Sequence, residues 1–127
     1  MNARLFLFCG ALSAAISVAL GAAGAHALAH LPELSQSWFR TALQYQQFHA
    51  LGLLAIGLLA DRFASRWIVV AGWLMIAGTL LFSGNLYLRS LADFHALHMV
   101  TPWGGGAFIL GWLTLAVGVV TSSVRRA

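Results

Sequence analysis

The sequence predicts an all-α membrane protein, an antiparallel four-helix transmembrane bundle formed by one domain over residues 1–127. The first observation is composition: 61% of the residues are hydrophobic and 8% are charged, whereas a soluble domain carries about 25% charged residues. The second is the spacing of the charges, which leaves four uncharged runs: Leu5–Pro32, Thr41–Ala60, Trp67–Leu88 and Phe94–Val124. Short connections join these runs, which favours helices that alternate in direction.

The limits of each span follow from length and from helix-breaking residues. A membrane-spanning helix needs about 20 residues, so the first and last runs must be trimmed. His30 and Pro32 indicate an end near residue 29, and Thr101 is expected as the N-cap before Pro102 at the first helical position. We therefore predict spans at residues 5–29, 40–60, 67–88 and 102–123. The segment Ala25–Ala27 imitates a signal-peptide cleavage site, but the apolar run before it exceeds the usual core of about 7–15 residues, which favours an uncleaved first helix.

The second span is unusual because its first half is polar. From Phe48 to Ala60 there are thirteen residues, too few to cross roughly 30 Å of hydrocarbon. The polar half must therefore lie in the membrane as well. At about 100° per residue, one arc of this helix carries Thr41, Tyr45, His49 and Gly52, with Gln46 at its edge. Polar groups in a span face the bundle interior or a wet cavity, and an ionisable one indicates a functional site.

The arginines predict the orientation of the bundle. All seven positively charged residues are arginine, and five lie at the end that holds both termini: Arg4, Arg62, Arg66, Arg125 and Arg126. Only Arg40 and Arg89 lie at the other end. The positive-inside rule therefore places both termini in the cytoplasm. Because the arginines flank apolar runs, they indicate anchoring in a lipid bilayer, and we do not expect nucleic acid as a partner.

Small residues form two stripes along the predicted helices. The first helix carries Ser13, Ser17, Gly21 and Ala25 at intervals of four, and the last carries Gly104, Gly111 and Gly118 at intervals of seven. Small residues at such intervals let helices approach closely in lipid. One interpretation is a homo-oligomer formed through these small-residue faces. The other, which we favour, is packing within the four-helix unit.

Polar side chains gather in the outer half of the predicted bundle. All five histidines lie on the outer side of the midplane: His26, His30, His49, His95 and His98. The inner half consists of Leu, Ile, Val, Ala and Gly. The candidate site is a polar cluster of six residues: Tyr45, Gln46, His49, Asn85, Tyr87 and Thr101.

Three interpretations of this cluster compete. The first is a metal or haem site built on His26 and His49, since imidazole suits zinc, copper and iron; no Cys, Asp or Glu completes the set, so no cofactor is the expectation. The second is a small-solute transporter acting as an oligomer, although the inner half offers no polar path. The third, which we favour, is structural: such side chains form hydrogen bonds between helices worth about 0.6–2 kcal/mol each.

Catalytic chemistry is not expected. The sequence has no nucleophile–base pair, no carboxylate dyad and no phosphate loop, and its three acidic residues lie at or beyond helix ends. Arg89 and Asp93 are four residues apart, a spacing that allows a pair only if the third helix extends, and an exposed pair of this kind is worth little. The lone Cys9 excludes an intramolecular disulfide. We therefore expect a scaffold or accessory protein with an outward-facing polar cluster.

Four motifs follow one another along the chain: GAAGAHAL at 21–28, W-x2-TALQYQQFHAL at 38–51, LFSGNLYL at 81–88 and TPWGGGAFILGW at 101–112. Together they resemble the Domain of Unknown Function 423 family of small bacterial inner-membrane proteins. The resemblance implies a multi-pass inner-membrane protein with four helices and an uncleaved first helix, and it implies no activity or cofactor. The matching positions are His26, Tyr45, Gln46, His49, Tyr87, Thr101, Pro102, Gly104 and Gly105. Ala23 and Asn85 depart from the family pattern.

Overall fold

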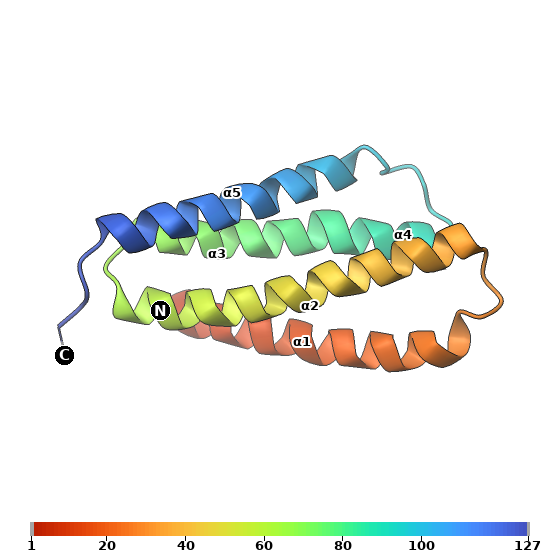
Figure 1. Ribbon diagram of the computed structural model, residues 1–127, viewed down its shortest axis with the longest axis horizontal. Helices are drawn as coiled ribbons and strands as arrows, with labels where there is room; N and C mark the ends of the chain where they lie inside the picture. The colour runs from red at the N-terminus through yellow and green to blue at the C-terminus, as the bar shows by residue number, and fades with distance from the viewer. Residues whose placement is uncertain (1, 127) are drawn as a thin grey trace.

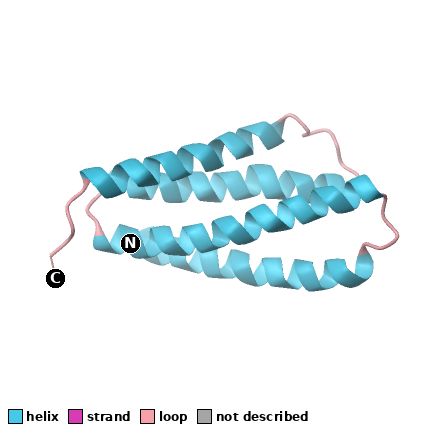
Figure 2. Ribbon diagram, viewed as in Figure 1, coloured by secondary structure: helices cyan, strands magenta, loops and turns pink. Residues whose placement is uncertain are grey.

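Four antiparallel helical rods make up the structure, a computed structural model that describes residues 2–126. The first rod is α1 (Asn2–Ala27) and the second is α2 (Glu33–Arg62). The third runs without a break through α3 (Arg66–Gly78), the π-helix η1 (Thr79–Gly84) and α4 (Asn85–Leu91). The fourth is α5 (Val100–Thr121). The two chain ends lie at the same end of the bundle (Figure 1), and within residues 2–126 all regular structure is helical (Figure 2).

The rods have the character of membrane helices. Three of them are long and apolar enough to cross a membrane: Asn2–Ala27, Arg66–Leu91 and Val100–Thr121. Large apolar side chains cover the outer surface, as at Phe8 and Val120, which are 64% and 81% exposed. Lipid tails are the solvent in which such a surface is stable. The expected all-α, antiparallel four-helix transmembrane fold is confirmed, although α2, with its polar first half, is not among the three rods that qualify by composition.

Helix boundaries differ from the predicted spans in instructive places. The second helix begins at Glu33, seven residues before the predicted start at residue 40, because the segment after Pro32 carries helix-compatible polar residues that the hydropathy pattern ignores. The prediction of Thr101 as an N-cap is wrong. α5 begins at Val100 with Met99 at the cap position, and the Thr101 hydroxyl accepts a hydrogen bond from Asn85 instead. How much of each rod lies in hydrocarbon stays a prediction.

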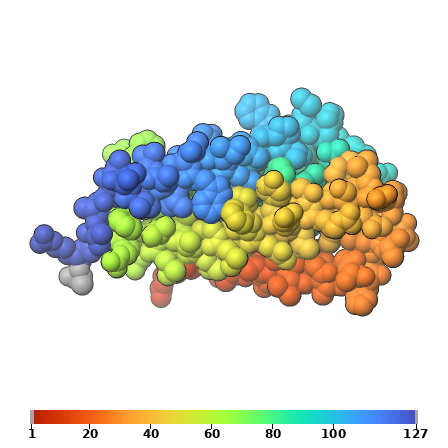
Figure 3. All heavy atoms as spheres, viewed as in Figure 1, coloured from red at the N-terminus to blue at the C-terminus, as the bar shows by residue number. Residues whose placement is uncertain are grey.

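The packing is organised in two closely packed pairs, α1 with α2 and α3 with α5. Between them lies a core whose most buried members are Phe6, Ile56, Ile68, Met75 and Phe108. In the space-filling view the side chains of α2 and α5 meet along the face towards the viewer (Figure 3). The side chains thus occupy space that is empty between the two ribbons in Figure 1.

The small-residue stripes lie partly between helices of the bundle. On α1, Ser17 is buried and a Cβ on Gly21 would meet Leu43 of α2, whereas Ala25 is exposed. On α5, a Cβ on Gly111 or Gly118 would meet side chains of α3. Packing within the chain uses these positions, and a homo-oligomer through the exposed part stays a prediction.

The π-helix η1 is the place where α5 approaches the third rod most closely. A Cβ on Gly104 would lie 2.5 Å from the backbone nitrogen of Phe82, far inside van der Waals contact, so only glycine fits there. Next to it, the Ser83 hydroxyl donates to the carbonyl oxygen of Ala42 at 2.8 Å. The wide turn of a π-helix and the missing side chain of Gly104 thus occur together, and π-helical turns are frequent at functional sites.

Backbone contacts close the end that holds the termini. The Arg125 N–H donates to the Arg62 carbonyl oxygen at 2.7 Å, and the Ala64 N–H donates to the Ser123 carbonyl oxygen at 3.1 Å. The tail after α5 therefore pairs with the connection between α2 and α3 and fixes the ends of three helices together.

Candidate functional site

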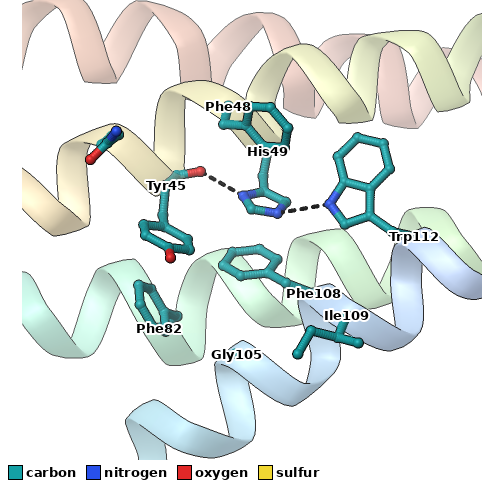
Figure 4. A pocket seen from close by; sticks show the side chains of 9 residues that line it. Tyr45, Phe48, His49, Phe82, Gly105, Phe108, Ile109 and Trp112 are labelled. Carbon is teal, nitrogen blue, oxygen red and sulfur yellow. Dashed lines mark hydrogen bonds between the residues drawn. The ribbon is translucent and has the colours of Figure 1, made fainter.

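His49, in the middle of α2, is held by hydrogen bonds at both ring nitrogens. Its Nδ1 lies 2.7 Å from the carbonyl oxygen of Tyr45, and its Nε2 lies 3.1 Å from the indole Nε1 of Trp112 on α5 (Figure 4). An indole N–H only donates and a carbonyl oxygen only accepts. Nε2 is therefore the acceptor and Nδ1 carries the proton, which fixes one tautomer of a neutral imidazole.

The ring of His49 also packs face to face on an aromatic neighbour. Its centroid is 3.5 Å from that of Phe108, with an angle of 12° between the planes. The side chain is buried, at 4% exposure. With both nitrogens paired and one face covered, His49 has no free lone pair to offer a metal ion.

Gln46, one turn earlier on α2, links three helices. Its Nε2 donates to the carbonyl oxygen of Ser13 on α1 at 3.1 Å and approaches the Ser13 hydroxyl at 3.3 Å. Its Oε1 accepts from the Tyr87 hydroxyl of α4 at 2.6 Å. A buried amide whose oxygen and nitrogen are both paired is the arrangement that fixes helix positions in a membrane bundle.

Asn85 and Thr101 form a second link, between α4 and α5. Asn85 is 3% exposed, and its Nδ2 donates to the carbonyl oxygen of Leu97 and to the Thr101 hydroxyl. Within residues 2–126 its Oδ1 has no hydrogen-bond partner. Asn85 thus ties the connection before α5 to the third rod.

Charged groups at the end opposite the termini do not form the pair between Arg89 and Asp93. That pair required the third helix to extend, but α4 ends at Leu91. Asp93 bonds to His95 instead, with Oδ1 and Nε2 2.6 Å apart. Asp93 has a positive φ of 52°, and this turn directs its backbone away from the helix axis that the prediction extended. The Arg89 guanidinium instead lies 4.2 Å above the Trp38 ring, a cation–π contact.

The structure does not bring His26 near His49. Along the α1–α2 pair, Gly24 faces Phe39 and Gly10 faces Ala50. Phe39 lies about 15 Å along α2 from His49 at 1.5 Å per residue. His26 lies beyond the level of Phe39 and is therefore more than about 15 Å from His49 along the helix axis. Across the part of the chain that the structure describes, no group of three or more His, Cys, Asp or Glu could hold a metal ion. The proposed pair cannot bind one ion in this arrangement.

Of the six predicted cluster residues, the structure joins three neighbouring groups. The Tyr45 carbonyl oxygen accepts a hydrogen bond from His49, Gln46 accepts one from Tyr87, and Asn85 donates one to Thr101. Sequence reasoning missed Trp112 and Ser13, which complete two of these groups. Trp112 is half-buried, and a tryptophan inside a span usually has a partner for its N–H, which is the signal that could have indicated it.

A groove of about 500 Å³ opens beside His49, between α2, η1 and α5. Figure 4 shows the rings of Tyr45, Phe82 and Phe108 turned towards one another in it. Its lining is Gln44, Tyr45, Phe48, His49, Phe82, Gly105, Phe108, Ile109 and Trp112. A smaller groove of about 250 Å³ lies on the other side of α2, against α1 and the third rod. His49 borders both.

Comparisons with known proteins agree on one family. Residues 20–105 match the family described as "Protein of unknown function (DUF423)". The chain is 41% identical to the UPF0382 membrane protein YwdK of Bacillus subtilis, over 92% of this chain and 97% of the relative. It is 38% identical to the UPF0382 inner membrane protein YgdD of Escherichia coli K12, over 94% and 92%. No solved structure matches the chain.

Proposed function

The chain belongs to the DUF423 family of membrane proteins, and from that premise we propose that it is a non-catalytic accessory protein of the bacterial inner membrane. It crosses the bilayer four times, with both termini in the cytoplasm. Its outer-half polar side chains hold the helices in one arrangement. The Escherichia coli relative is named an inner membrane protein, which supports this location. The lipid bilayer is the partner that the apolar outer surface of this chain requires.

One observation carries this proposal: the polar side chains of the cluster bond to other helices. Gln46 joins α1 and α4 to α2, and His49 joins α5 to α2. A general base needs a free lone pair directed at a substrate, and both nitrogens of His49 already have partners. The arrangement supports fastening of helices better than proton transfer or metal binding.

The arginine distribution supports the orientation. Both termini lie at one end of the bundle (Figure 1), together with Arg62, Arg66 and Arg125. The opposite end holds Arg40 and Arg89. Four passes also require α2 to span, and its inward-facing Gln46 and His49 remove its strongest polar groups from lipid.

Labelling of single cysteines tests the topology. In a Cys9→Ser background, Ala96→Cys places a thiol in the exposed connection before α5, and Ser123→Cys places one in the exposed tail. In intact spheroplasts, a membrane-impermeant maleimide should label the first variant and label the second only after lysis. The reverse pattern would contradict the orientation, and labelling of both in intact cells would contradict a crossing of the bilayer by α5.

Elemental analysis tests the absence of a cofactor role. Protein purified in mild detergent without chelator should contain metal well below one atom per chain and show no Soret band. A stoichiometric metal that is lost in His49→Gln, while the protein stays folded, would overturn the proposal.

A further inference from the structure

We propose that the groove between α2 and α5 binds the ring of a membrane-soluble quinone. This goes beyond the accessory role, because it assigns a ligand to the groove beside the His49–Trp112 bond, where Gln44 and Tyr45 take no part in fastening the helices through their side chains. The inference rests on three features of the groove: how it is reached, which polar groups it leaves unpaired, and what lines it.

The groove is reached sideways. α2 and α5 do not form one of the closely packed pairs; the His49–Trp112 bond and the stack on Phe108 bridge them. The rim residues Phe48 and Ile109 are 60% and 63% exposed. In a bundle surrounded by acyl chains, an opening between two spans faces the bilayer, so its occupant enters from the lipid.

Two side chains in the groove have polar groups that hydrocarbon cannot satisfy. Tyr45 is 41% exposed, and Gln44 beside it is exposed too. Among the described residues, no hydrogen bond pairs the Tyr45 hydroxyl or the Gln44 amide; the bond that Tyr45 makes uses its backbone oxygen. Gln44 and Tyr45 lie about 10 Å along α2 from Trp38, an aromatic residue near the beginning of this helix, at 1.5 Å per residue. Unpaired donors at that depth are costly, so an occupant with oxygen acceptors is favoured over an acyl chain.

The smaller groove supports this distinction. Its amide and one of its hydroxyls are already paired: Gln46 bonds to Ser13 and to Tyr87, and the Thr79 hydroxyl donates to the carbonyl oxygen of Met75. The larger groove differs because its amide, Gln44, and its phenol, Tyr45, both have side chains without a partner among the described residues.

The lining favours a flat ring. Six of the nine lining residues carry aromatic rings, and aromatic pairs gain energy from stacked and edge contacts that a flexible chain does not make. Gly105 leaves room beside them, since a Cβ there would meet only the Phe82 ring, at 3.8 Å. A volume of about 500 Å³ falls in the range of small-molecule sites, about 300–1,000 Å³. A flat ring with carbonyl oxygens and a hydrocarbon tail is the chemistry of a quinone.

Two adjacent glycines provide a matched test. Gly105→Leu fills the groove, whereas Gly106→Leu makes the same change of side chain where a Cβ meets nothing within 4 Å. Native mass spectrometry of the full chain, released from detergent, would measure binding of a benzoquinone with a decyl tail. Decyl alcohol, which has the tail without the ring, is the control ligand.

The wild type and Gly106→Leu should bind one quinone per chain, and Gly105→Leu should bind at least tenfold more weakly. Tyr45→Phe removes one neutral hydrogen bond and should weaken binding about three- to tenfold; it also tests the site if Gly105→Leu does not fold. Equal binding by all variants, no binding by the wild type, or equal binding of decyl alcohol would each overturn the proposal. So would a phospholipid adduct that is lost in Gly105→Leu and not displaced by the quinone.

Discussion

Removing the Tyr87–Gln46 hydrogen bond should measurably loosen the bundle. The bond is short, 2.6 Å from the Tyr87 hydroxyl to Gln46 Oε1, and Gln46 is 5% exposed. Hydrogen bonds between membrane helices contribute about 0.6 kcal/mol on average and up to about 1.7 kcal/mol. Because this bond is buried and short, Tyr87→Phe should lower the free energy of unfolding by about 1 kcal/mol. Gln46→Leu also removes the bond to Ser13 and should cost about 1–3 kcal/mol.

A double-mutant cycle isolates the bond itself. Once Gln46 is leucine, the Tyr87 hydroxyl has lost its acceptor, so Tyr87→Phe should then cost almost nothing. The coupling energy should be about 1 kcal/mol, measured by titrating dodecyl sulfate into dodecylmaltoside micelles and following far-UV circular dichroism. Independent sites add within about 0.3–0.5 kcal/mol. If Tyr87→Phe costs the same in both backgrounds within that margin, the bond does not fasten the helices and the reasoning fails.

Three further substitutions test the packing around the site. His49→Gln introduces an amide that can bond to Trp112 but loses the stack on Phe108. The protein should fold, and its free energy of unfolding should fall by about 0.5–1.5 kcal/mol; loss of folding in a detergent screen would show that more than this stack depends on the ring. Gly104→Ala places a methyl group against the backbone of η1 and should cost about 1–3 kcal/mol. Gly106→Ala, with open space around it, should be neutral or stabilising by up to about 1 kcal/mol; equal thermal stability of the two variants would contradict the close approach.

Periodicity predicted which face of α2 turns inward, but not what it meets. The arc through Tyr45 and His49, with Gln46 at its edge, follows from 3.6 residues per turn; Gln46 and His49 are buried, whereas Tyr45 is 41% exposed. The partners depend on how the other helices are rotated about their own axes. Nothing in the local sequence determines that Ser13 and Trp112 face this arc, so these two residues were missed.

The beginning of α5 shows a different limit. Thr101 before Pro102 has the composition of an N-cap, yet α5 begins at Val100, two residues before the predicted start, and the Thr101 hydroxyl accepts from Asn85 on another rod. A tertiary hydrogen bond here outweighed a local preference. The π-helix η1 has no signal of its own in hydropathy; it accompanies the contact with Gly104, which depends on the approach of α5.

The metal hypothesis for His26 and His49 fails on the register of two helices. The packing of α1 against α2 places the two residues more than about 15 Å apart along the helix axis. Residue type alone suggested ligands, whereas the contacts of Gly10 and Gly24 of α1 with α2 show the register. These contacts are available only from the folded chain.

The tautomer of His49 tests the central claim most directly. Nitrogen-15 NMR of the imidazole, in protein labelled at histidine and reconstituted in lipid, reports which nitrogen carries the proton and whether the other accepts a hydrogen bond. We predict a neutral ring with the proton on Nδ1 and with Nε2 bonded to the Trp112 indole, a signal that changes in Trp112→Phe. A ring protonated on Nε2, a doubly protonated ring or a metal-bound nitrogen would show that His49 serves chemistry instead of holding α2 and α5 together.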